Sequence, residues 1–387
     1  MPVKHRTSAL LNRLKGGPTG AFIHIGPPKT GTTYLQDILW ANEKPLRRQG
    51  VLLPGKAKRE HFRAAKDVRR LNRRKKGIDA GGPWGTLAAQ MRSWPGRSVV
   101  SSEWLAACRE AAVAHIVTSL GEVPTHVVIT ARDLGRVVPA VWQERVKNGS
   151  GRTLPDFVAG LADPEHDDLG RTFWNVHDSQ ALVRRWCTVL PPERVHLVIV
   201  PTAGAAPDEL WHRFAGIFLE DTAAYDTASV AANPGLGAAD AEFLRRVNVE
   251  MDGRLDKSVH ATNVKNLLAK QTLAGRNDAG GRIELDAGTR SWLSERADRT
   301  IDELRSSGCH VVGDLDELRV SVDGPAELLT PETTDPVAVA RAGVLAVREL
   351  LLAAQRAPTS KRGHAPSGEN LEDQDLEDQD LAESDHG

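Results

Sequence analysis

Short runs of apolar, β-branched residues alternate with longer segments of helical periodicity over the first 200 or so residues of the chain. Continuous apolar runs are typical of strands that are buried on both faces, whereas apolar residues spaced three and four apart indicate amphipathic helices. The strand-like runs lie at 21–26, 51–55, 97–103, 126–132 and 194–201. Helical segments between such strands predict a mainly parallel sheet with helices on both faces, which is an α/β fold.

The helical segments can be placed from the same pattern. After the first strand, Leu35, Ile38 and Leu39 share one helical face, and the pattern predicts a single helix over 33–50 that ends at Gly50. The second half of the chain is more helical, with amphipathic spacing in 208–219, 237–251 and 286–308. In open α/β sheets ligands bind outside the carboxyl ends of the strands, so the residues after each strand are the first candidates for a site.

The two ends of the chain differ in composition from the rest. We expect a flexible N-terminus at 1–19, an α/β domain at 20–320, a helical extension at 321–357 and a disordered acidic tail at 358–387. The tail contains three imperfect five-residue repeats that begin at Leu371, Leu376 and Leu381. So polar a segment cannot bury enough apolar surface to fold.

Composition excludes several classes of protein. No apolar run approaches the length of a membrane span, and the N-terminus lacks the apolar core of a signal peptide. The three cysteines stand far apart without a metal-binding spacing, and the net charge of -1 gives no general attraction to nucleic acid. We therefore expect a cytoplasmic protein with reduced thiols, no nucleic-acid partner and no membrane span, whose oligomeric state is not predicted.

The segment 25–36, IGPPKTGTTYLQ, joins the first strand to the first helix and carries the residues of an anion-binding loop. Free N–H groups at a helix N-terminus attract anions, Gly31 lets the backbone approach them, and Thr32 and Thr33 add hydroxyl groups. Lys29 adds a positive charge. The alternative is a plain turn in which Thr30 caps the helix. In a nucleoside triphosphate loop the lysine follows the last glycine, whereas here it precedes the glycine, and no acidic strand end stands in the place of a magnesium-holding aspartate.

The stretch PKTGTTYLQ resembles the 5′-phosphosulfate loop of sulfotransferases, which use 3′-phosphoadenosine 5′-phosphosulfate (PAPS) as donor and have a related, P-loop-like α/β fold of three layers. The resemblance implies that PAPS is the cosubstrate and that Tyr34 stacks on its adenine. The residues that it assigns to the 5′-phosphosulfate are Lys29, Gly31, Thr32 and Thr33, with Thr30 in the same loop. The resemblance is specific over about 20–150 and diffuse to about 220.

A second match concerns the 3′-phosphate of the same cosubstrate. The family places an arginine after a later strand and a serine eight residues further on, inside a helix. Arg132 stands in the arginine position, but the serine position is Ala140, so one phosphate contact is missing. Arg136 or Gln143, on the same predicted helix, would replace it. The alternative for Arg132 is a surface ion pair. The late glycine-rich segment that closes over the nucleotide in cytosolic members has only a weak counterpart at 274–282.

The resemblance implies in-line transfer of a sulfuryl group to a hydroxyl or amine acceptor. The moving group carries less charge than a phosphoryl group, so Lys29 and backbone dipoles can stabilise the transition state and no metal is expected. Two residues compete as the base that takes the acceptor's proton. Glu103 ends a predicted strand at the carboxyl edge of the sheet. His61 lies in REHFRAA, which is similar to a Glu-x-His-Phe stretch of heparan sulfate sulfotransferases, although one residue of that spacing is missing here. The alternative for Glu103 is an acid at a helix N-terminus that the helix dipole stabilises, and the alternative for His61 is a histidine on a helix face without a catalytic role.

Two other classes of function remain open at this point. One is a kinase-like phosphotransferase, which would need a nucleoside triphosphate and Mg²⁺, and the other is a non-catalytic nucleotide-binding protein of the same fold. The basic stretch 56–76 is either a solvated helix or a rim that attracts an anionic acceptor or the acidic tail. We expect a small-molecule or carbohydrate acceptor.

Overall fold

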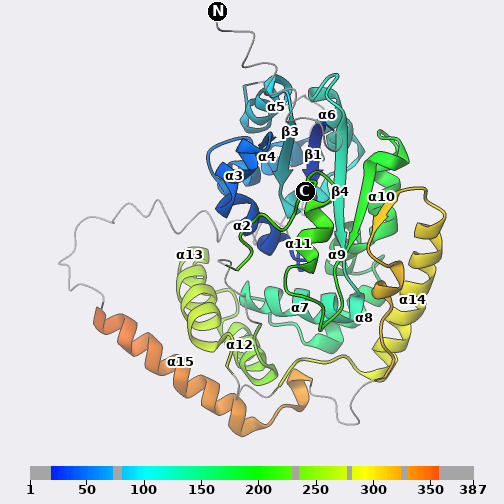
Figure 1. Cartoon of the computed structure of the whole chain (residues 1–387). Coiled ribbons are helices and arrows are strands. Elements are labelled where there is room, and N and C mark those ends of the chain that lie inside the picture. Colours follow the sequence, from blue (N-terminus) through cyan, green and yellow to red (C-terminus); the bar gives the residue numbers. More distant parts are fainter. Residues whose placement is uncertain (1–18, 73–80, 229–234, 277–280, 324–329, 357–387) are drawn as a thin grey trace, which may run out of the picture. The chain divides into compact units, whose positions relative to one another are not determined.

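The structure is a computed structural model that describes the residues 19–72, 81–228, 235–276, 281–323 and 330–356 (Figure 1). The predicted acidic tail lies outside the described residues. The chain forms two compact units. The first comprises Met1–Leu134, Trp174–Ala231 and Glu295–Arg319, and the second comprises Gly135–Phe173, Ala232–Ser294 and Val320–Gly387. The domain boundaries that we predicted from sequence stay a prediction.

The first unit contains a six-stranded sheet in which all neighbouring strands are parallel, in the order β2-β3-β1-β4-β5-β6. The strands are β1 (Gly20–His24), β2 (Val51–Leu52), β3 (Arg97–Ser101), β4 (Thr125–Ala131), β5 (Val195–Ile199) and β6 (His310–Val312). The first five coincide with the predicted runs, and this confirms the α/β fold with a parallel sheet. The sequence did not predict β6, because three residues are too few to show a periodicity.

Helices of the first unit flank this sheet (Figure 1). They are α2 (Thr32–Ala41), α3 (Glu43–Arg48), α4 (Lys58–Arg69), α5 (Pro83–Ser93), α6 (Glu110–Ser119), α10 (Ser179–Cys187) and α11 (Glu209–Ala215), with short 3₁₀ helices η1 (Arg70–Asn72), η2 (Glu103–Ala107), η3 (Pro192–Arg194) and η5 (Leu315–Leu318). Leu35 and Ile38 from α2 and Phe214 from α11 pack in one apolar cluster with Phe22 of β1 and Val128 of β4. Helix α10 packs against β4 and β5.

The single helix predicted over 33–50 is wrong, because the segment forms the two helices α2 and α3. Pro45 has no N–H group and cannot donate to the carbonyl of Ala41, so the α-helical ladder cannot continue through this point. The side chain of Asn42 donates to the carbonyls of Ile38, at 2.9 Å, and Asp226, at 2.8 Å. The Asn42 amide therefore provides a hydrogen-bond donor for a carbonyl group at the end of α2. Its second hydrogen bond, to Asp226, stabilises the break between α2 and α3.

The second unit is helical, and none of the residues that the structure describes in it lies in a strand. Its helices are α7 (Leu134–Lys147, whose first residue belongs to the first unit), α8 (Leu154–Ala162), α12 (Ala238–Met251), α13 (Lys257–Val259), a π-helix (His260–Leu273), a 3₁₀ helix (Pro331–Thr333) and α15 (Pro336–Arg356). Helices α9 (Asp168–His177) and α14 (Ala287–Arg305) have residues in both units. Helix α15 packs on α12 and on the π-helix. None of the described helices combines the length and the apolar character that a membrane crossing requires.

Candidate functional site

The topology of the sheet points to the carboxyl ends of β1 and β4. These strands are neighbours, but the connection that leaves β1 leads to β2 on one side of the sheet and the connection that leaves β4 leads to β5 on the other. Ligands of open α/β sheets bind at such a switch point. Strand β3 lies on the other side of β1, so the carboxyl ends of β3, β1 and β4, which precede Glu103, Lys29 and Arg132, are side by side.

The loop after β1 has an unusual backbone. Lys29, with φ of 67°, and Gly31, with φ of 87°, both adopt the left-handed conformation, which is uncommon for a residue other than glycine. Gly31 is the N-cap of α2 and no side chain caps this helix, so the alternative that Thr30 caps it is wrong. The first helical hydrogen bond runs from Leu35 N–H to the Gly31 carbonyl, at 3.1 Å. The N–H groups before Leu35 thus have no acceptor within the helix. A left-handed turn followed by such N–H groups is a geometry that suits an anion.

Two of the three threonines in this loop hold its shape. The hydroxyl of Thr30 donates to the Pro27 carbonyl, at 2.7 Å, and lies 2.6 Å from the hydroxyl of Thr130 in β4. The hydroxyl of Thr32 donates to the Gly26 carbonyl, at 3.1 Å. Both side chains are buried, whereas Thr33, in the first turn of α2, is exposed to solvent.

His24 lies beneath the loop and is completely buried. Its Nδ1 is 2.8 Å from the hydroxyl of Ser101 in β3, and its Nε2 has no hydrogen-bond partner among the described residues. A Cβ atom on Gly26 would lie 2.6 Å from this Nε2 and 2.1 Å from the Thr130 hydroxyl, so only glycine fits at that position. Burial lowers the pKa of His24 to about 3, and the imidazole is therefore neutral.

The end of β4 is tied to the loop by Arg132, whose Nη1 donates to the carbonyl of Lys29, at 3.1 Å. This contact places a guanidinium group beside the loop. Tyr34 is half-buried and its hydroxyl donates to the Pro207 carbonyl, at 3.0 Å. Its pKa is raised by burial and by the negative charge of Asp208.

Glu103 is not part of β3, which ends at Ser101, but begins the 3₁₀ helix that follows. It is half-buried, and its Oε2 accepts a hydrogen bond from the Gln36 amide, at 3.1 Å. The predicted strand therefore ended two residues too late. The carboxylate nevertheless lies just beyond the carboxyl end of a strand that neighbours β1.

His61, the second candidate base, is buried and uses both ring nitrogens. Its Nε2–H donates to the Pro54 carbonyl, at 2.8 Å, and its Nδ1 accepts from the Ser101 N–H, at 3.2 Å. Burial lowers the pKa of His61 to about 4, although the hydrogen bond from its Nε2–H to the Pro54 carbonyl acts in the opposite direction. To accept a proton, His61 would have to release the Ser101 N–H and charge a buried ring.

Arg136, Ala140 and Gln143 lie on α7 in the second unit. Both ends of the Gln143 amide contact one backbone position, because Nε2 donates to the Leu236 carbonyl, at 2.9 Å, and Oε1 accepts from the Leu236 N–H, at 3.3 Å. The assignment of these residues to a 3′-phosphate site stays a prediction. The weak candidate segment at 274–282 lies partly outside the described residues.

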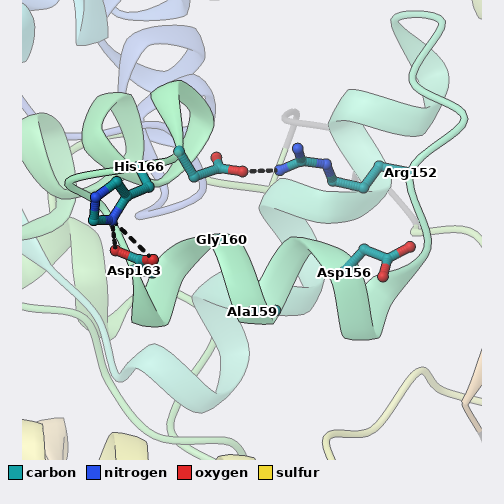
Figure 2. A pocket seen from close by; sticks show the side chains of 7 residues that line it. Arg152, Asp156, Ala159, Gly160, Asp163 and His166 are labelled. Carbon is teal, nitrogen blue, oxygen red and sulfur yellow. Dashed lines mark hydrogen bonds and ion pairs between the residues drawn. The ribbon is translucent and has the colours of Figure 1, made fainter.

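A pocket of about 470 Å³ lies in the second unit and is lined by charged side chains (Figure 2). Four of them form two pairs: Arg152 donates to Asp167, at 2.6 Å, and the ring of His166 is 2.9 Å from Asp163. Asp167 also accepts the N–H of Gly170, at 2.9 Å, so it has a structural role. Among the described residues, no group of three or more His, Cys, Asp or Glu side chains could hold a metal ion.

Four residues that meet near the loop were not predicted from sequence: His24, Gln36, Ser101 and Thr130. Their common feature is a polar side chain at a buried position of a strand or helix. The histidine in the run AFIHIG was visible as a polar exception. Only the fold, however, brings residues of β1, α2, β3 and β4 together.

Comparison with known proteins gives one likeness to report. No family model and no curated protein matches the sequence. The structure is similar to the crystal structure of a sulfotransferase from Alicyclobacillus acidocaldarius, with a TM-score of 0.40 and 13% sequence identity, over 63% of this chain and 99% of that one. A likeness this distant bears on neither the site nor the activity of the chain.

Proposed function

We propose that the first unit binds PAPS at the loop 25–34 and transfers its sulfuryl group to a hydroxyl or amine acceptor. The observation that carries the proposal is the loop itself, in which left-handed Lys29 and Gly31 precede an uncapped helix N-terminus at the switch point of the sheet. A second observation supports it, since the Nε2 of fully buried His24 lies beneath this loop without a hydrogen-bond partner among the described residues. Buried polar atoms are otherwise nearly always paired.

The charges near the loop suit the 5′-phosphosulfate. Lys29 lies in the loop, and Arg132 is tied to its carbonyl. Backbone N–H groups of the first turn of α2 would contact the sulfuryl and phosphate oxygens, with the exposed hydroxyl of Thr33 beside them. Arg132 would also serve the 3′-phosphate, and Tyr34 would stack on the adenine. Arg136 or Gln143 would supply the contact that Ala140 lacks.

The proposed reaction is an in-line displacement at sulfur. The acceptor oxygen or nitrogen forms a new bond to sulfur while the bond from sulfur to the bridging phosphate oxygen breaks, which leaves adenosine 3′,5′-bisphosphate. Lys29 neutralises the charge that develops on this bridging oxygen. The acceptor's proton passes to a general base of this chain.

Glu103 is the proposed base. Its half-buried carboxylate lies beyond the end of β3, next to the strand that leads into the loop. His61 is the weaker candidate, because its Nδ1 lone pair is engaged by the Ser101 N–H and its Nε2–H by the Pro54 carbonyl. We assign His61 the role of supporting the end of β3.

Transfer of radiolabelled sulfur tests the proposal. The protein is incubated with ³⁵S-labelled PAPS and an extract of small molecules and carbohydrates, with Mg²⁺ present or chelated, and a parallel reaction contains γ-labelled ATP with Mg²⁺. We expect labelled sulfur on an acceptor, without dependence on Mg²⁺, and no transfer from ATP. Transfer from ATP would support the phosphotransferase alternative. Binding of adenosine 3′,5′-bisphosphate without any transfer would support the non-catalytic one.

We propose further that the acceptor is a small molecule or carbohydrate and that the protein acts in the cytoplasm. The basic character of α4 fits an anionic acceptor, although Lys58 on this helix already pairs with Asp37 of α2, at 3.1 Å. The same ³⁵S incubation identifies the acceptor by fractionation of the labelled product.

A further inference from the structure

Gln36 is a buried amide on a helix face that is mostly apolar, with Thr32 as its other buried polar residue. Gln36 is 3% exposed, and its neighbours on the buried face of α2 are Leu35, Ile38 and Leu39. A buried amide is costly unless it is hydrogen-bonded. Residues that break a local apolar pattern in this way are concentrated at functional sites.

The Gln36 amide nitrogen donates to two acceptors at the end of β3. One is the carbonyl of Ser101, at 3.3 Å, and the other is Oε2 of Glu103, at 3.1 Å. The first contact fixes the amide relative to the strand, and the second fixes one oxygen of the carboxylate relative to the amide. The side chain of Gln36 thus links the backbone of β3 to the carboxylate of Glu103.

Ser101, which accepts the hydrogen bond from Gln36, also contacts two buried histidines. The hydroxyl of Ser101 is 2.8 Å from Nδ1 of His24, and its N–H donates to Nδ1 of His61, at 3.2 Å. Ser101 and both histidines are buried. Because the backbone and side chain of Ser101 are all engaged, a rigid layer lies behind the amide of Gln36.

We infer that Gln36 is a positioning residue: its amide holds one carboxylate oxygen of Glu103 and thereby aims the carboxylate in one direction. A hydrogen bond to the charged form of an acid favours that form. The orienting contact matters for catalysis because a base works only within hydrogen-bond reach of the proton that it takes. The catalytic part of the inference rests on the proposed function, whereas the effect of Gln36 on Glu103 does not.

The test is Gln36→Met, which keeps the length of the side chain and removes the donor. The carboxyl carbon of Glu103 is followed by ¹³C NMR through a pH titration, and its resonance is identified as the one that Glu103→Gln lacks. We expect the titration midpoint of Glu103 to rise by about one pH unit and kcat to fall at least about tenfold. The affinity for adenosine 3′,5′-bisphosphate should stay unchanged.

Two further variants complete the design. Gln90→Met is the matched control, because the Gln90 amide is likewise hydrogen-bonded to the backbone, through its Oε1, which accepts from the Gly55 N–H at 2.8 Å. This variant should alter neither the titration nor kcat. Gln36→Asn keeps an amide on a side chain that is too short to reach Glu103. This variant replaces Gln36→Met in the test if Gln36→Met does not fold.

The two proposals fail in distinguishable ways. An unchanged titration midpoint of Glu103 in a folded Gln36 variant would overturn the inference, whatever the activity. A raised midpoint in a protein that transfers no sulfuryl group would uphold the positioning by Gln36 and contradict the proposed function.

Discussion

The two ends of the parallel sheet both contain buried histidines, but only one end has the features of a binding site. At the amino end, His126, His196 and His310 form a row across β4, β5 and β6, with ring nitrogens 2.9 Å and 2.8 Å apart. At the carboxyl end, His24 and His61 meet at Ser101. Burial lowers the pKa at both ends, to about 4 for His126 and about 3 for His196, as it does for His24 and His61.

The difference between the ends therefore lies in the backbone. The strand starts of β4, β5 and β6 are in regular parallel register, and both ring nitrogens of His196 are engaged by neighbouring histidines. The other end has two left-handed residues and an uncapped helix N-terminus. The lowered histidine pKa values therefore do not distinguish the two ends, whereas the backbone at the switch point does.

The largest expected effect is that of Glu103→Gln, which should lower the rate of sulfuryl transfer about a hundredfold or more. The affinity for adenosine 3′,5′-bisphosphate should stay nearly the same, because the base acts only in the transition state. Rates and calorimetric affinities of the purified variant check this. His196→Gln, at the other end of the sheet, serves as the control and should keep full activity. Full activity of Glu103→Gln would remove this residue from the mechanism.

Acid should destabilise both ends of the sheet alike. The unfolded pKa of histidine is about 6.5, and the folded values of His24 and His61 are about 3 and about 4, so the unfolded chain binds more protons between these limits. The free energy of unfolding should therefore fall as the pH drops from 6.5 towards 4, by on the order of 2 kcal/mol for each buried histidine. Urea unfolding at pH 7 and pH 4.5 measures this. The double variant His126→Gln/His196→Gln should lose less stability in acid than the wild type, and an equal loss would contradict the account.

Substitution of the left-handed residue Lys29 by glycine should change stability and nucleotide binding in opposite directions. Lys29→Gly relieves a left-handed backbone and should raise the free energy of unfolding by about 1 kcal/mol, while it weakens nucleotide binding. Asp252, with φ of 45° at the end of α12, is the only other non-glycine residue with positive φ among those the structure describes. Asp252→Gly is therefore the matched control, which should also stabilise but leave binding intact. Denaturant unfolding and calorimetry are compared for both, and a Lys29→Gly protein that binds as the wild type does would contradict the assignment of the loop.

The smallest expected effect is that of Ala140→Ser. The resemblance to sulfotransferases places a serine hydroxyl on the 3′-phosphate at this position, so its restoration should preserve the affinity for adenosine 3′,5′-bisphosphate or tighten it a few-fold. Titration with adenosine 5′-phosphate, which lacks the 3′-phosphate, is the control and should show no gain. A large loss of affinity for the bisphosphate would mean that α7 does not take part.

Most of the strands and the residues of the loop after β1 could be predicted from the sequence. The β-branched runs located five of the six strands, and the loop residues from Lys29 to Thr33 could be singled out because glycine, threonine and lysine between a strand and a helix have a definite chemistry. The break at Asn42 was missed, since it depends on Pro45 and on a contact to Asp226 that is distant in sequence.

The polar layer beneath the loop could not be predicted, because its hydrogen bonds join residues far apart in sequence. His24 meets Ser101 and Thr30 meets Thr130 only because β1 lies between β3 and β4 in the sheet. The strand order is a property of the whole fold and leaves no local pattern. The role of Gln36 follows from the same packing.

Calorimetric titration with adenosine 3′,5′-bisphosphate tests the central claim, that the Lys29 loop holds the phosphosulfate end of the nucleotide, most directly. We expect Lys29→Ala to weaken binding about ten- to a hundredfold, since a charged hydrogen bond to phosphate is lost. Lys58→Ala, which removes the same charge from the pair with Asp37, should change the affinity less than about threefold. Equal affinities of the wild type and Lys29→Ala, or equal losses in the two lysine variants, would contradict the claim.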